Sequence, residues 1–402
     1  MEYNFNEGQK KVFDAALDWY FNSDDLVFEF SGGPGRGKTW VLNAIIHALQ
    51  LEEWEIAPMT YTGAAAINMR RKGMVNAKTA HSWLYSAVDV PLMRDGKIVM
   101  NYKFNRPVMT KKFVPHPLDP GIKLVVADEG WSIPEPVADE IRKQGVKILV
   151  TGDRDQLPPV GAPPGFLRDP NVMRLTENMR QGNTFNGIEY LSQRALRGLP
   201  LHVGYYGNAI VLSRSMFLKN MDLYMNNMDI IICSRNATRD DFTRYCRSKR
   251  GYQDRKLPVY GEPVVSRENV WDMEVDGINL VNGLRGVVMN MPDASGVNWT
   301  QKTFNIDFKP DNMDKAFFNV TGDYNYINLD HTLRNEYKDH ETHYKRGILF
   351  EYGYAISTYM AQGSEYNNVL YIQESLGGLS TTSDYVGITR ARNFLIVVLS
   401  DG

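Results

Sequence analysis

Short apolar runs alternate with longer segments of helical periodicity along most of this chain. In the first half, the pattern predicts helices at about residues 7–21, 40–50 and 63–72, and strands at 26–30, 54–57, 122–128 and 146–152. A further strand is expected at 230–234, and the alternation returns between residues 347 and 399. Strands that alternate with helices are typical of α/β architecture with parallel sheets.

Two segments break this alternation. Residues 87–120 contain the turn sequence RDG, then an alternating stretch, then several prolines, which indicates a small β-hairpin insertion. Residues 251–345 contain short strands separated by Gly, Asn and Asp turns, which indicates a small β barrel. We therefore expect two α/β lobes, each interrupted by a β insertion, and a chain of 402 residues is long enough for such a division.

The segment GGPGRGKT matches the phosphate-binding pattern G-x-x-x-x-G-K-[S/T] at every position. It follows a predicted strand and precedes a predicted helix, so backbone N–H groups and the positive helix end would face a phosphate. Lys38 would contact the β- and γ-phosphates, and the Thr39 hydroxyl would bind Mg²⁺. The alternative is a glycine-rich turn with an unrelated lysine. The predicted nucleotide-binding loop comprises Gly32, Gly33, Pro34, Gly35, Arg36, Gly37, Lys38 and Thr39.

A carboxylate pair follows the apolar run LVVA. Asp128 and Glu129 would lie at the carboxyl end of a buried strand, where α/β sheets place their ligands. Asp128 could hold Mg²⁺ there, and Glu129 could orient or deprotonate the attacking water. Such a pair on its own is usually solvated surface, so its place after the phosphate-binding loop carries the prediction.

Composition narrows the options further. The net charge of −2 means that any nucleic-acid site must be a local groove. Two cysteines suit a reducing compartment and exclude a disulfide framework. The polar, acidic start MEYNFNEGQ is unlike a secretory signal, and we find no apolar run long enough to span a membrane.

Six further segments resemble the motifs of superfamily 1B DNA helicases of the RecD and Dda type. VTGDRDQLPPV resembles motif III, and YVGITRAR resembles motif VI; both patterns are specific. YAISTYMAQGSEYNNV resembles motif V, LTENMRQ motif IV, AKTAHSWL motif Ib and FNEGQKKVF the adenine-reading Q motif. The matches follow the family order over nearly the whole chain, and the size and insertions are most similar to the phage Dda-type helicases.

The resemblance implies two RecA-like P-loop lobes with a β-hairpin insertion, 1B, and an SH3-like β-barrel insertion, 2B. Lobe 1A would comprise residues 1–86 and 121–180, with 1B at 87–120. Lobe 2A would comprise residues 181–250 and 346–402, with 2B at 251–345.

The resemblance also implies the roles of the ATP-site residues. Gln9 would read the adenine edge, and Gln156 would sense the γ-phosphate. Arg180 and Arg390 would be arginine fingers from the second lobe. Gly363 and Glu365 would contact phosphate and ribose. Taken alone, such residues are more often a helix cap, a turn glutamine or surface ion-pair partners.

By the same resemblance, the single-stranded DNA track would include Pro58, Thr60, Thr79, His81, Thr358 and Gln362. Hydroxyls and backbone amides would contact phosphates without reading sequence. His81 could equally be a residue at a helix start. The basic segment 235–250 is either a phosphate-facing strip or a solvated helix face.

Three motifs depart from the family pattern. Met59 replaces a threonine in motif Ia, so the phosphate-binding hydroxyl would come from Thr60 or Thr62. Tyr359 and Met360 replace His-Lys in motif V, which removes a cation from the DNA track. Trp131 follows the Asp-Glu pair in place of the usual serine, and we expect it to fill the core.

The sequence thus favours an ATP- and Mg²⁺-dependent DNA helicase that moves 5′→3′ on single-stranded DNA and unwinds duplex junctions, in DNA replication, repair or recombination. We expect a monomer in the cytoplasm of a bacterial or phage-infected cell, with single-strand-binding or replication proteins as candidate partners. An alternative is a DNA-stimulated ATPase that remodels proteins or serves as a non-unwinding subunit of a larger complex. A binding module without turnover is a third class, which the intact ATP-site residues disfavour.

The 1B insertion is expected to carry the strand-separating wedge. Ile98, Met100, Tyr102 and Phe104 would share one face of a strand, because strand side chains alternate. An aromatic side chain on this face could stack on the last base pair. The alternative is that Tyr102 and Phe104 only pack the hairpin onto the lobe.

Overall fold

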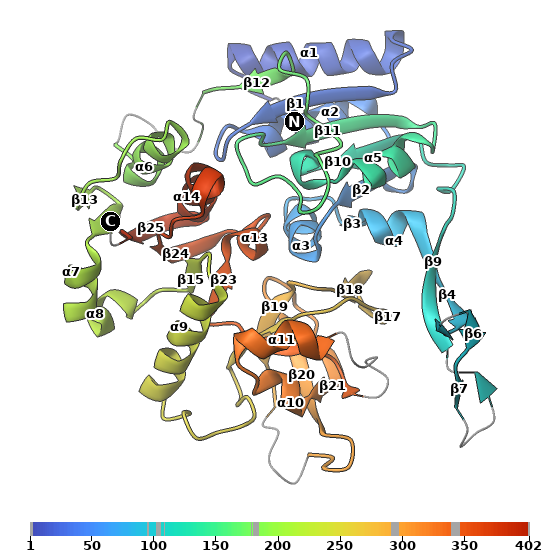
Figure 1. Ribbon diagram of the computed structural model, residues 1–402. Helices are drawn as coiled ribbons and strands as arrows, with labels where there is room; N and C mark the ends of the chain where they lie inside the picture. Colours follow the sequence, from blue (N-terminus) through green and yellow to red (C-terminus); the bar gives the residue numbers. More distant parts are fainter. Residues whose placement is uncertain are drawn as a thin grey trace.

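The computed structural model describes residues 3–94, 96–101, 106–107, 109–177, 179, 185–290, 297–338 and 346–400. They form two α/β lobes, an antiparallel β unit and a projecting β ribbon (Figure 1). Tyr102, Phe104 and Arg180 lie outside the described residues, so the predicted wedge side chains and one predicted arginine finger have no structural description here.

The first lobe is built on a six-stranded parallel sheet with the order β12-β1-β11-β10-β2-β3. Its strands are β1 (Val27–Gly32), β2 (Ile56–Thr60), β3 (Lys78–Thr79), β10 (Leu124–Ala127), β11 (Lys147–Gly152) and β12 (Met173–Leu175). Its helices are α1 (Glu7–Asn22), α2 (Lys38–Leu49), α3 (Gly63–Arg71), α4 (Ala80–Leu84) and α5 (Glu135–Arg142), with 3₁₀ turns η1 (Glu53–Glu55) and η2 (Gly130–Ser132). The helices and strands predicted for this region are confirmed, with ends that differ by a few residues.

The second lobe also has a six-stranded sheet, with the order β13-β14-β25-β24-β15-β23. Its strands are β13 (Gly204–Tyr206), β14 (Ala209–Leu212), β15 (Ile230–Cys233), β23 (Ala355–Ser357), β24 (Tyr366–Ile372) and β25 (Ala391–Val398); β13 alone pairs antiparallel. Its helices are α6 (Gly187–Leu196), α7 (Arg214–Lys219), α8 (Met221–Met225), α9 (Asn236–Lys249), α13 (Thr358–Ala361) and α14 (Ser380–Thr389), with the 3₁₀ turn η4 (Gly377–Leu379).

The insertion in the second lobe is an antiparallel five-stranded sheet with the order β21-β20-β19-β16-β22. Its strands are β16 (Pro263–Ser266), β19 (Arg285–Val288), β20 (Thr303–Pro310), β21 (Phe317–Asp323) and β22 (Phe350–Tyr352), beside the hairpin of β17 (Val270–Val275) and β18 (Ile278–Leu280) and the helices α10 (Tyr324–Ile327) and α11 (His331–Lys338). Phe304, Phe308 and Phe350 fill its core. The closure of this sheet into an SH3-like barrel stays a prediction.

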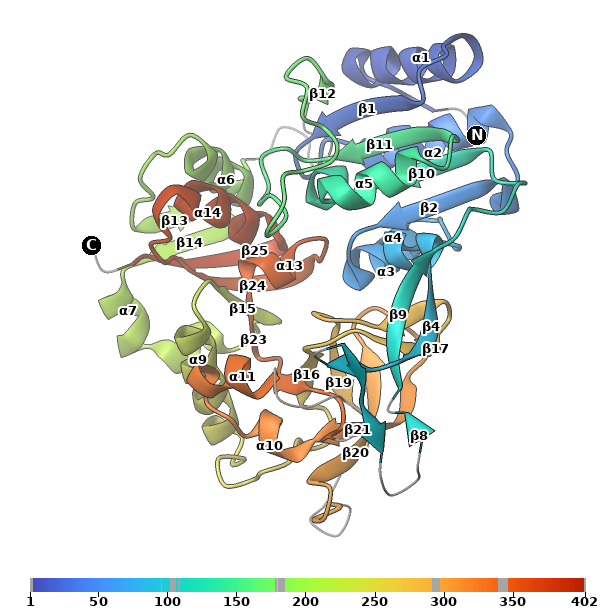
Figure 2. The ribbon, with the colours of Figure 1, turned by 45° about the vertical axis from the view of Figure 1, so that its right-hand side comes forward.

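The insertion in the first lobe is a ribbon in which β4 (Tyr85–Pro91) pairs antiparallel with β9 (Met109–Pro115). Beyond it lie the short pairs β5 (Met93–Arg94) with β6 (Lys97–Ile98), and β7 (Met100–Asn101) with β8 (Arg106–Pro107). The alternating stretch is therefore divided into two short strands with different partners, and Val99 between them donates its N–H to Leu92 O, next to the β5–β6 pair. Figure 2 shows the ribbon extending from the first lobe beside the antiparallel unit, where Phe113 and Trp271 lie 5.1 Å apart between ring centroids.

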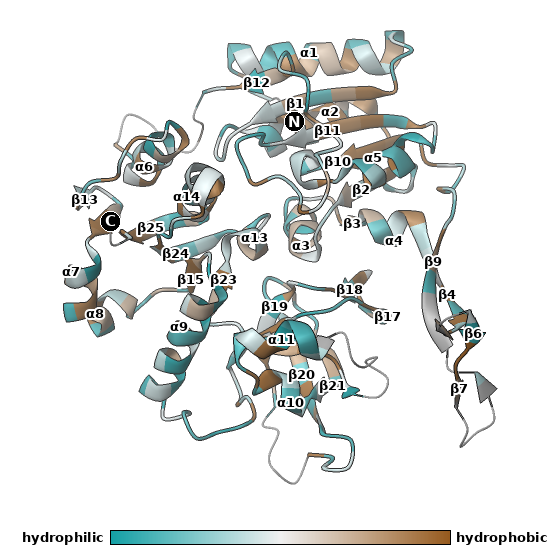
Figure 3. Cartoon of the chain, in the orientation of Figure 1, coloured by the Kyte–Doolittle hydropathy of each residue, from teal (hydrophilic) through white to brown (hydrophobic). Residues whose placement is uncertain are grey.

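Each lobe has apolar side chains on both faces of its sheet. In the first lobe, one face of the sheet packs with α1 and α2, and the other packs with α4 and α5. Figure 3 shows hydrophobic colour along β1, β10 and β11, as expected for parallel strands buried on both faces. The carboxyl ends of these strands are the edge at which the polar motif residues gather.

Candidate active site

The phosphate-binding loop joins β1 to α2. It ends at Gly37, the residue before α2, which has the left-handed φ of 79°. A Cβ at Gly37 would lie 2.4 Å from Gln9 Nε2, so this turn has no space for a side chain. The sequence therefore folds into a loop that delivers the first N–H groups of α2 to an open pocket.

A pocket of about 280 Å³ lies over this loop, between the lobes. Lys38 lines it, and its ammonium group donates to Gly32 O at 2.7 Å and Gly33 O at 3.3 Å. The structure brings together in this pocket the residues Gly33, Pro34, Gly35, Arg36, Gly37, Lys38, Thr39, Asp128, Glu129, Gln156, Gly363, Glu365 and Arg390 of the sequence prediction, with Asn68, Lys72 and Met179.

The carboxylate pair sits at the end of β10, opposite the loop. Asp128 Oδ1 accepts from the Glu129 backbone N–H at 2.9 Å. Within the described residues, neither the Thr39 hydroxyl nor Asp128 Oδ2 has a protein partner, so both oxygens remain available to a hard cation such as Mg²⁺. The oxygen donor set therefore fits the metal expected for this site.

Glu129 has an unusual backbone and an unusual acidity. Its φ of 54° is left-handed, which is strained for a residue with a side chain. Burial and the neighbouring Asp128 charge raise the pKa of the Glu129 carboxyl, against the opposing effect of Lys38, Arg390 and Lys72. A carboxylate with a raised pKa is better suited to accept a proton from water.

Trp131 has a role that sequence reasoning missed. Its indole N–H donates to Gln156 O at 2.9 Å, so it ties the turn after the carboxylate pair to motif III. The side chain is half-buried and packs against the core of the first lobe, as expected, and it makes this hydrogen bond in addition. A buried indole N–H needs an acceptor, and that need is the one sequence signal that pointed beyond packing.

The second lobe contributes Arg390, at the end of α14. The side chain is 4% exposed and donates to Val386 O, Ser364 O and Thr389 Oγ1 at 3.1–3.2 Å. These three acceptors are neutral, and the guanidinium lines the nucleotide pocket. Glu365 on the same wall is held by Arg392, at 2.6 Å.

Gln9 lies behind the phosphate-binding loop and is fully buried. Its Oε1 accepts from Asn6 N at 3.2 Å, which completes the capping box at the start of α1. Its Nε2 is buried with no partner in the described structure. The Nε2 donor next to Gly37 is therefore available to hydrogen-bond a nucleobase, whereas Oε1 is already used by the helix cap.

Among the described residues, four polar contacts join the lobes around this pocket. Tyr385 OH of α14 donates to Asp153 Oδ2 at 2.7 Å, and Gln362 Nε2 donates to Leu157 O at 2.8 Å. Asn68 Nδ2 donates to Gly363 O, and the P-loop Arg36 forms an ion pair with Glu189 of α6 at 2.6 Å. Sequence reasoning identified none of Tyr385, Asp153 and Glu189, because each contact joins segments far apart in the chain.

The residues predicted for the DNA track lie deeper than expected. Pro58 is buried within β2. Three hydroxyls are buried and bonded internally: Thr60 to Thr62 O, Thr79 to Ser82, and Thr358 to Ser383. Gln362 bonds across the lobes, as described above. The side chains of Pro58, Thr60, Thr79 and Thr358 are therefore buried in this arrangement, and only Gln362 is partly exposed.

His81 lies in an aromatic group between the first lobe and the antiparallel unit. Its ring is 5.5 Å from Tyr85 and 6.0 Å from both Tyr61 and Trp271, measured between centroids. Burial lowers the pKa of the imidazole. His81 therefore belongs to an aromatic cluster, in which its ring stacks on Tyr85 and is tilted relative to Tyr61 and Trp271.

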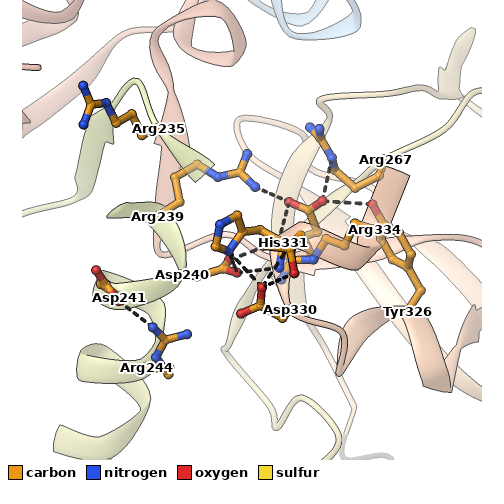
Figure 4. Close-up of polar contacts among 12 residues, drawn as sticks. Arg235, Arg239, Asp240, Asp241, Arg244, Arg267, Tyr326, Asp330, His331 and Arg334 are labelled. Carbon is orange, nitrogen blue, oxygen red and sulfur yellow. Dashed lines mark hydrogen bonds and ion pairs between the residues drawn. The ribbon is translucent and has the colours of Figure 1, made fainter. Parts of the chain in front are cut away.

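The basic segment 235–250 forms α9 and its flanks, and most of its cations pair with other groups of the protein, as Figure 4 shows for Arg244 and Asp241. Arg239 and Arg247 are buried in ion pairs with Glu351 and Glu262. The exposed cations also have partners: Arg244 with Asp241, and Lys249 with Asp222. The interpretation as a phosphate-facing strip is therefore not supported for these four cations.

No helix within the described residues is long and apolar enough to cross a membrane.

Comparisons with known proteins agree with this geometry. Residues 4–201 match the family model of an AAA domain. A comparison with curated proteins finds no match. Among solved structures, Bacteroides Pif1 bound to ADP-AlF3 and single-stranded DNA shares 16% identity over 100% of this chain and 93% of its own, with a TM-score of 0.54.

Two further solved structures show the same likeness. A Pif1 helicase described at forked duplex DNA shares 17% identity, covering 98% of this chain and 92% of its own, with a TM-score of 0.55. Candida albicans Pif1 shares 14%, covering 99% and 95%, with a TM-score of 0.51. At these identities the likeness is one of fold: the chain shares the mixed α/β, P-loop fold of the Pif1 helicases over nearly its full length.

Proposed function

We propose that this protein is an ATP-dependent DNA helicase that translocates 5′→3′ along single-stranded DNA. One observation carries the proposal: a single pocket contains Lys38, Asp128 and Gln156 from one lobe and Arg390 from the other. A site assembled from two lobes links the state of the nucleotide to the distance between the lobes, which is the property a translocating motor needs.

The residues of the pocket would divide the work as follows. When nucleotide binds, the Lys38 ammonium group would donate to phosphate oxygens in place of the Gly32 and Gly33 carbonyls. Glu129 would orient the attacking water and accept its proton, and Arg390 would stabilise charge that develops on the transferred phosphoryl group. Thr39 and Asp128 would hold Mg²⁺, which supplies charge neutralisation on the phosphates. Gln156 of motif III would contact the γ-phosphate, and its backbone carbonyl accepts a hydrogen bond from Trp131.

The polynucleotide is the second ligand in this proposal. Two structures of Bacteroides Pif1, which has the same fold, contain bound single-stranded DNA. We propose that the strand crosses both lobes near motifs Ib and V, with contacts through backbone groups and the aromatic group around His81, since the predicted hydroxyls are bonded internally. The proposed 5′→3′ direction of translocation rests on the motif resemblance. The proposed location in the cytoplasm of a bacterial or phage-infected cell rests on the same resemblance.

The domain limits and the wedge belong to the same proposal. Lobes 1A and 2A, insertion 1B at 87–120 and insertion 2B at 251–345 would act as separate units. We keep Tyr102 and Phe104 as wedge candidates, with hairpin packing as the competing role. Arg180 remains a proposed second arginine finger.

One observation favours the alternative of a non-unwinding, DNA-stimulated ATPase. Met360 stands where the family has a cation, and its Sδ accepts from Arg267 and Arg239 at 3.1 and 3.5 Å. Two arginines that could reinforce a DNA grip are thus directed to a thioether and to Glu351. A weaker grip would favour ATP turnover without strand separation.

Two assays on the full chain separate these functions. Unwinding is measured on duplexes with only a 5′ or only a 3′ single-stranded tail, and translocation on single strands carrying an end label. The helicase proposal expects unwinding from the 5′ tail. Translocation without unwinding of either duplex would support the alternative, and unwinding from the 3′ tail would overturn the direction while leaving the ATPase intact.

A further inference from the structure

The ion pair between Arg36 and Glu189 is unlike the other contacts that join the lobes. Arg36 Nη2 lies 2.6 Å from Glu189 Oε1, and the side chains are 15% and 29% exposed. Arg36 belongs to the phosphate-binding loop of the first lobe, and Glu189 to the first turn of α6 in the second lobe. Among the described residues, the other contacts between the lobes around this pocket involve at least one neutral partner.

The pair stands at a boundary inside the cleft. The nucleotide pocket of about 280 Å³ and a neighbouring pocket of about 490 Å³ share the lining residues Gly33, Pro34, Arg36 and Glu365. Glu189 lines the outer pocket, together with Tyr385 and Arg392. Because the two side chains belong to opposite lobes, a movement that widens the cleft at this point would separate Arg36 from Glu189.

Separation of the pair carries an electrostatic cost. Both side chains are largely withdrawn from water, so their attraction is screened less than that of a surface pair. An interaction present only while the lobes touch shifts the equilibrium toward the closed form. Any ligand that leaves only through the open form is then retained longer.

We propose that Arg36 and Glu189 form an interlobe latch that keeps the cleft closed over bound nucleotide and slows the release of the nucleoside diphosphate. The latch rests on the proposed function, because it presumes that the pocket binds nucleotide. Glu189 is a positioning residue in this scheme: it acts on the nucleotide through Arg36. Hydrolysis itself stays with the groups described above.

The test is the release rate of a fluorescent ADP from the full chain, measured by stopped-flow chase with excess ADP. Glu189→Gln keeps the shape of the side chain and removes its charge, and it should speed release about 3- to 10-fold. Glu189→Asp keeps the charge on a shorter stem and should restore part of the slow release. Added salt should speed release from the wild type and have little effect on Glu189→Gln.

Two controls match this design. Gln193→Ala removes an uncharged side chain of α6 that lines the same outer pocket. Glu336→Gln removes an exposed charge on α11. Both should release ADP at the wild-type rate.

Glu189 has a further interaction besides Arg36, so a double-mutant cycle isolates the pair. Glu189→Gln should change release by less than about 2-fold when Arg36→Gln is already present. An equal acceleration in both backgrounds, an unchanged rate or a slower release in Glu189→Gln would overturn the latch. Failure of the wild type to bind the nucleotide would instead overturn the proposed function.

Discussion

The second lobe contacts the first lobe at the nucleotide cleft and the antiparallel unit at a second junction, and charged side chains have different partners in these two places. At the nucleotide cleft, two cations that line an open pocket bond to neutral groups: Lys38 to carbonyls, and Arg390 to carbonyls and a hydroxyl. At the junction with the antiparallel unit, buried charges neutralise one another. Arg239, Arg267 and Arg334, which are labelled in Figure 4, each form an ion pair with Glu351.

The pKa values show the same difference. Burial alone would raise the pKa of Glu351, but the three arginines outweigh it and hold this pKa at about 2. In the cleft, burial and Asp128 raise the pKa of Glu129. A charge that is compensated by fixed partners gives a rigid joint, whereas incompletely compensated charges leave a site that a charged ligand can complete. Substitutions should therefore affect chemistry in the cleft and stability at the junction.

The largest effect is expected for Lys38→Ala. It removes the cation that would contact the transferred phosphoryl group, so ATP turnover should fall by about 10³-fold or more. Affinity for single-stranded DNA should stay near the wild-type value, because the strand is proposed to bind elsewhere. Steady-state ATPase and fluorescence anisotropy measure the two quantities. ATPase activity within about tenfold of the wild type would show that the cleft has been misread.

Arg390→Ala should reduce DNA-stimulated turnover by about 10²- to 10³-fold, with a much smaller loss of nucleotide affinity, since its charge acts mainly in the transition state. Nucleotide titration beside turnover tests this. Arg392→Ala is the comparison, because that guanidinium pairs with Glu365 and does not line the nucleotide pocket. Equal losses in affinity and turnover for Arg390→Ala would limit Arg390 to ground-state binding.

At the junction, Glu351→Gln should lower the free energy of unfolding by roughly 3 kcal/mol near neutral pH, because three arginines lose their shared anion. The pKa of Glu351 is lowered from 4.5 to about 2 by folding, so its stabilisation is complete above about pH 4.5 and is lost as pH falls toward 2. The free energy of unfolding, measured with urea between pH 2.5 and 7, should depend more steeply on pH in the wild type than in the variant. The exposed Glu336→Gln serves as control, and matching pH profiles for the wild type and Glu351→Gln would contradict the assignment.

The smallest effect is expected for Trp131→Phe, which keeps the ring and removes the N–H that bonds to Gln156 O. Turnover should fall about 3- to 10-fold with unchanged nucleotide affinity, in line with about 1 kcal/mol for one hydrogen bond. Trp83→Phe removes a matching N–H that bonds to Pro58 O at 2.8 Å, away from the nucleotide pocket. A greater loss of turnover in Trp83→Phe would mean that Trp131 only supports the fold.

The same contrast explains what could be predicted from the sequence. The cleft is built from contiguous motifs, and each strand-to-loop segment carries its own chemistry, so Lys38 and Asp128 could be predicted from local pattern and Gln156 from its motif resemblance. The junction is built from residues distant in the chain: Arg239 pairs with Glu351 across 112 positions. A basic helix sequence does not reveal whether its charges face phosphate, solvent or a buried carboxylate. For the same reason the contacts of Arg36, Asp153 and Tyr385 across the lobes had no sequence signal.

The DNA track was harder to predict for a different reason. Hydroxyls that the motif resemblance places beside the DNA strand can also cap helices, and the Thr79 hydroxyl does so at the start of α4. Thr60 and Thr358 likewise satisfy neighbouring groups. A buried hydroxyl near a sheet edge forms hydrogen bonds within the protein, because each buried polar group needs a partner. A motif therefore does not show whether such a hydroxyl contacts DNA.

The central claim is that one cleft couples ATP hydrolysis to a single strand of DNA. The most direct measurement is the steady-state ATPase rate of the full chain with and without single-stranded DNA, in the wild type and in Lys38→Ala. The account predicts that DNA stimulates the wild-type rate by at least about tenfold and leaves Lys38→Ala inactive. A wild-type rate that is the same with and without DNA would contradict it.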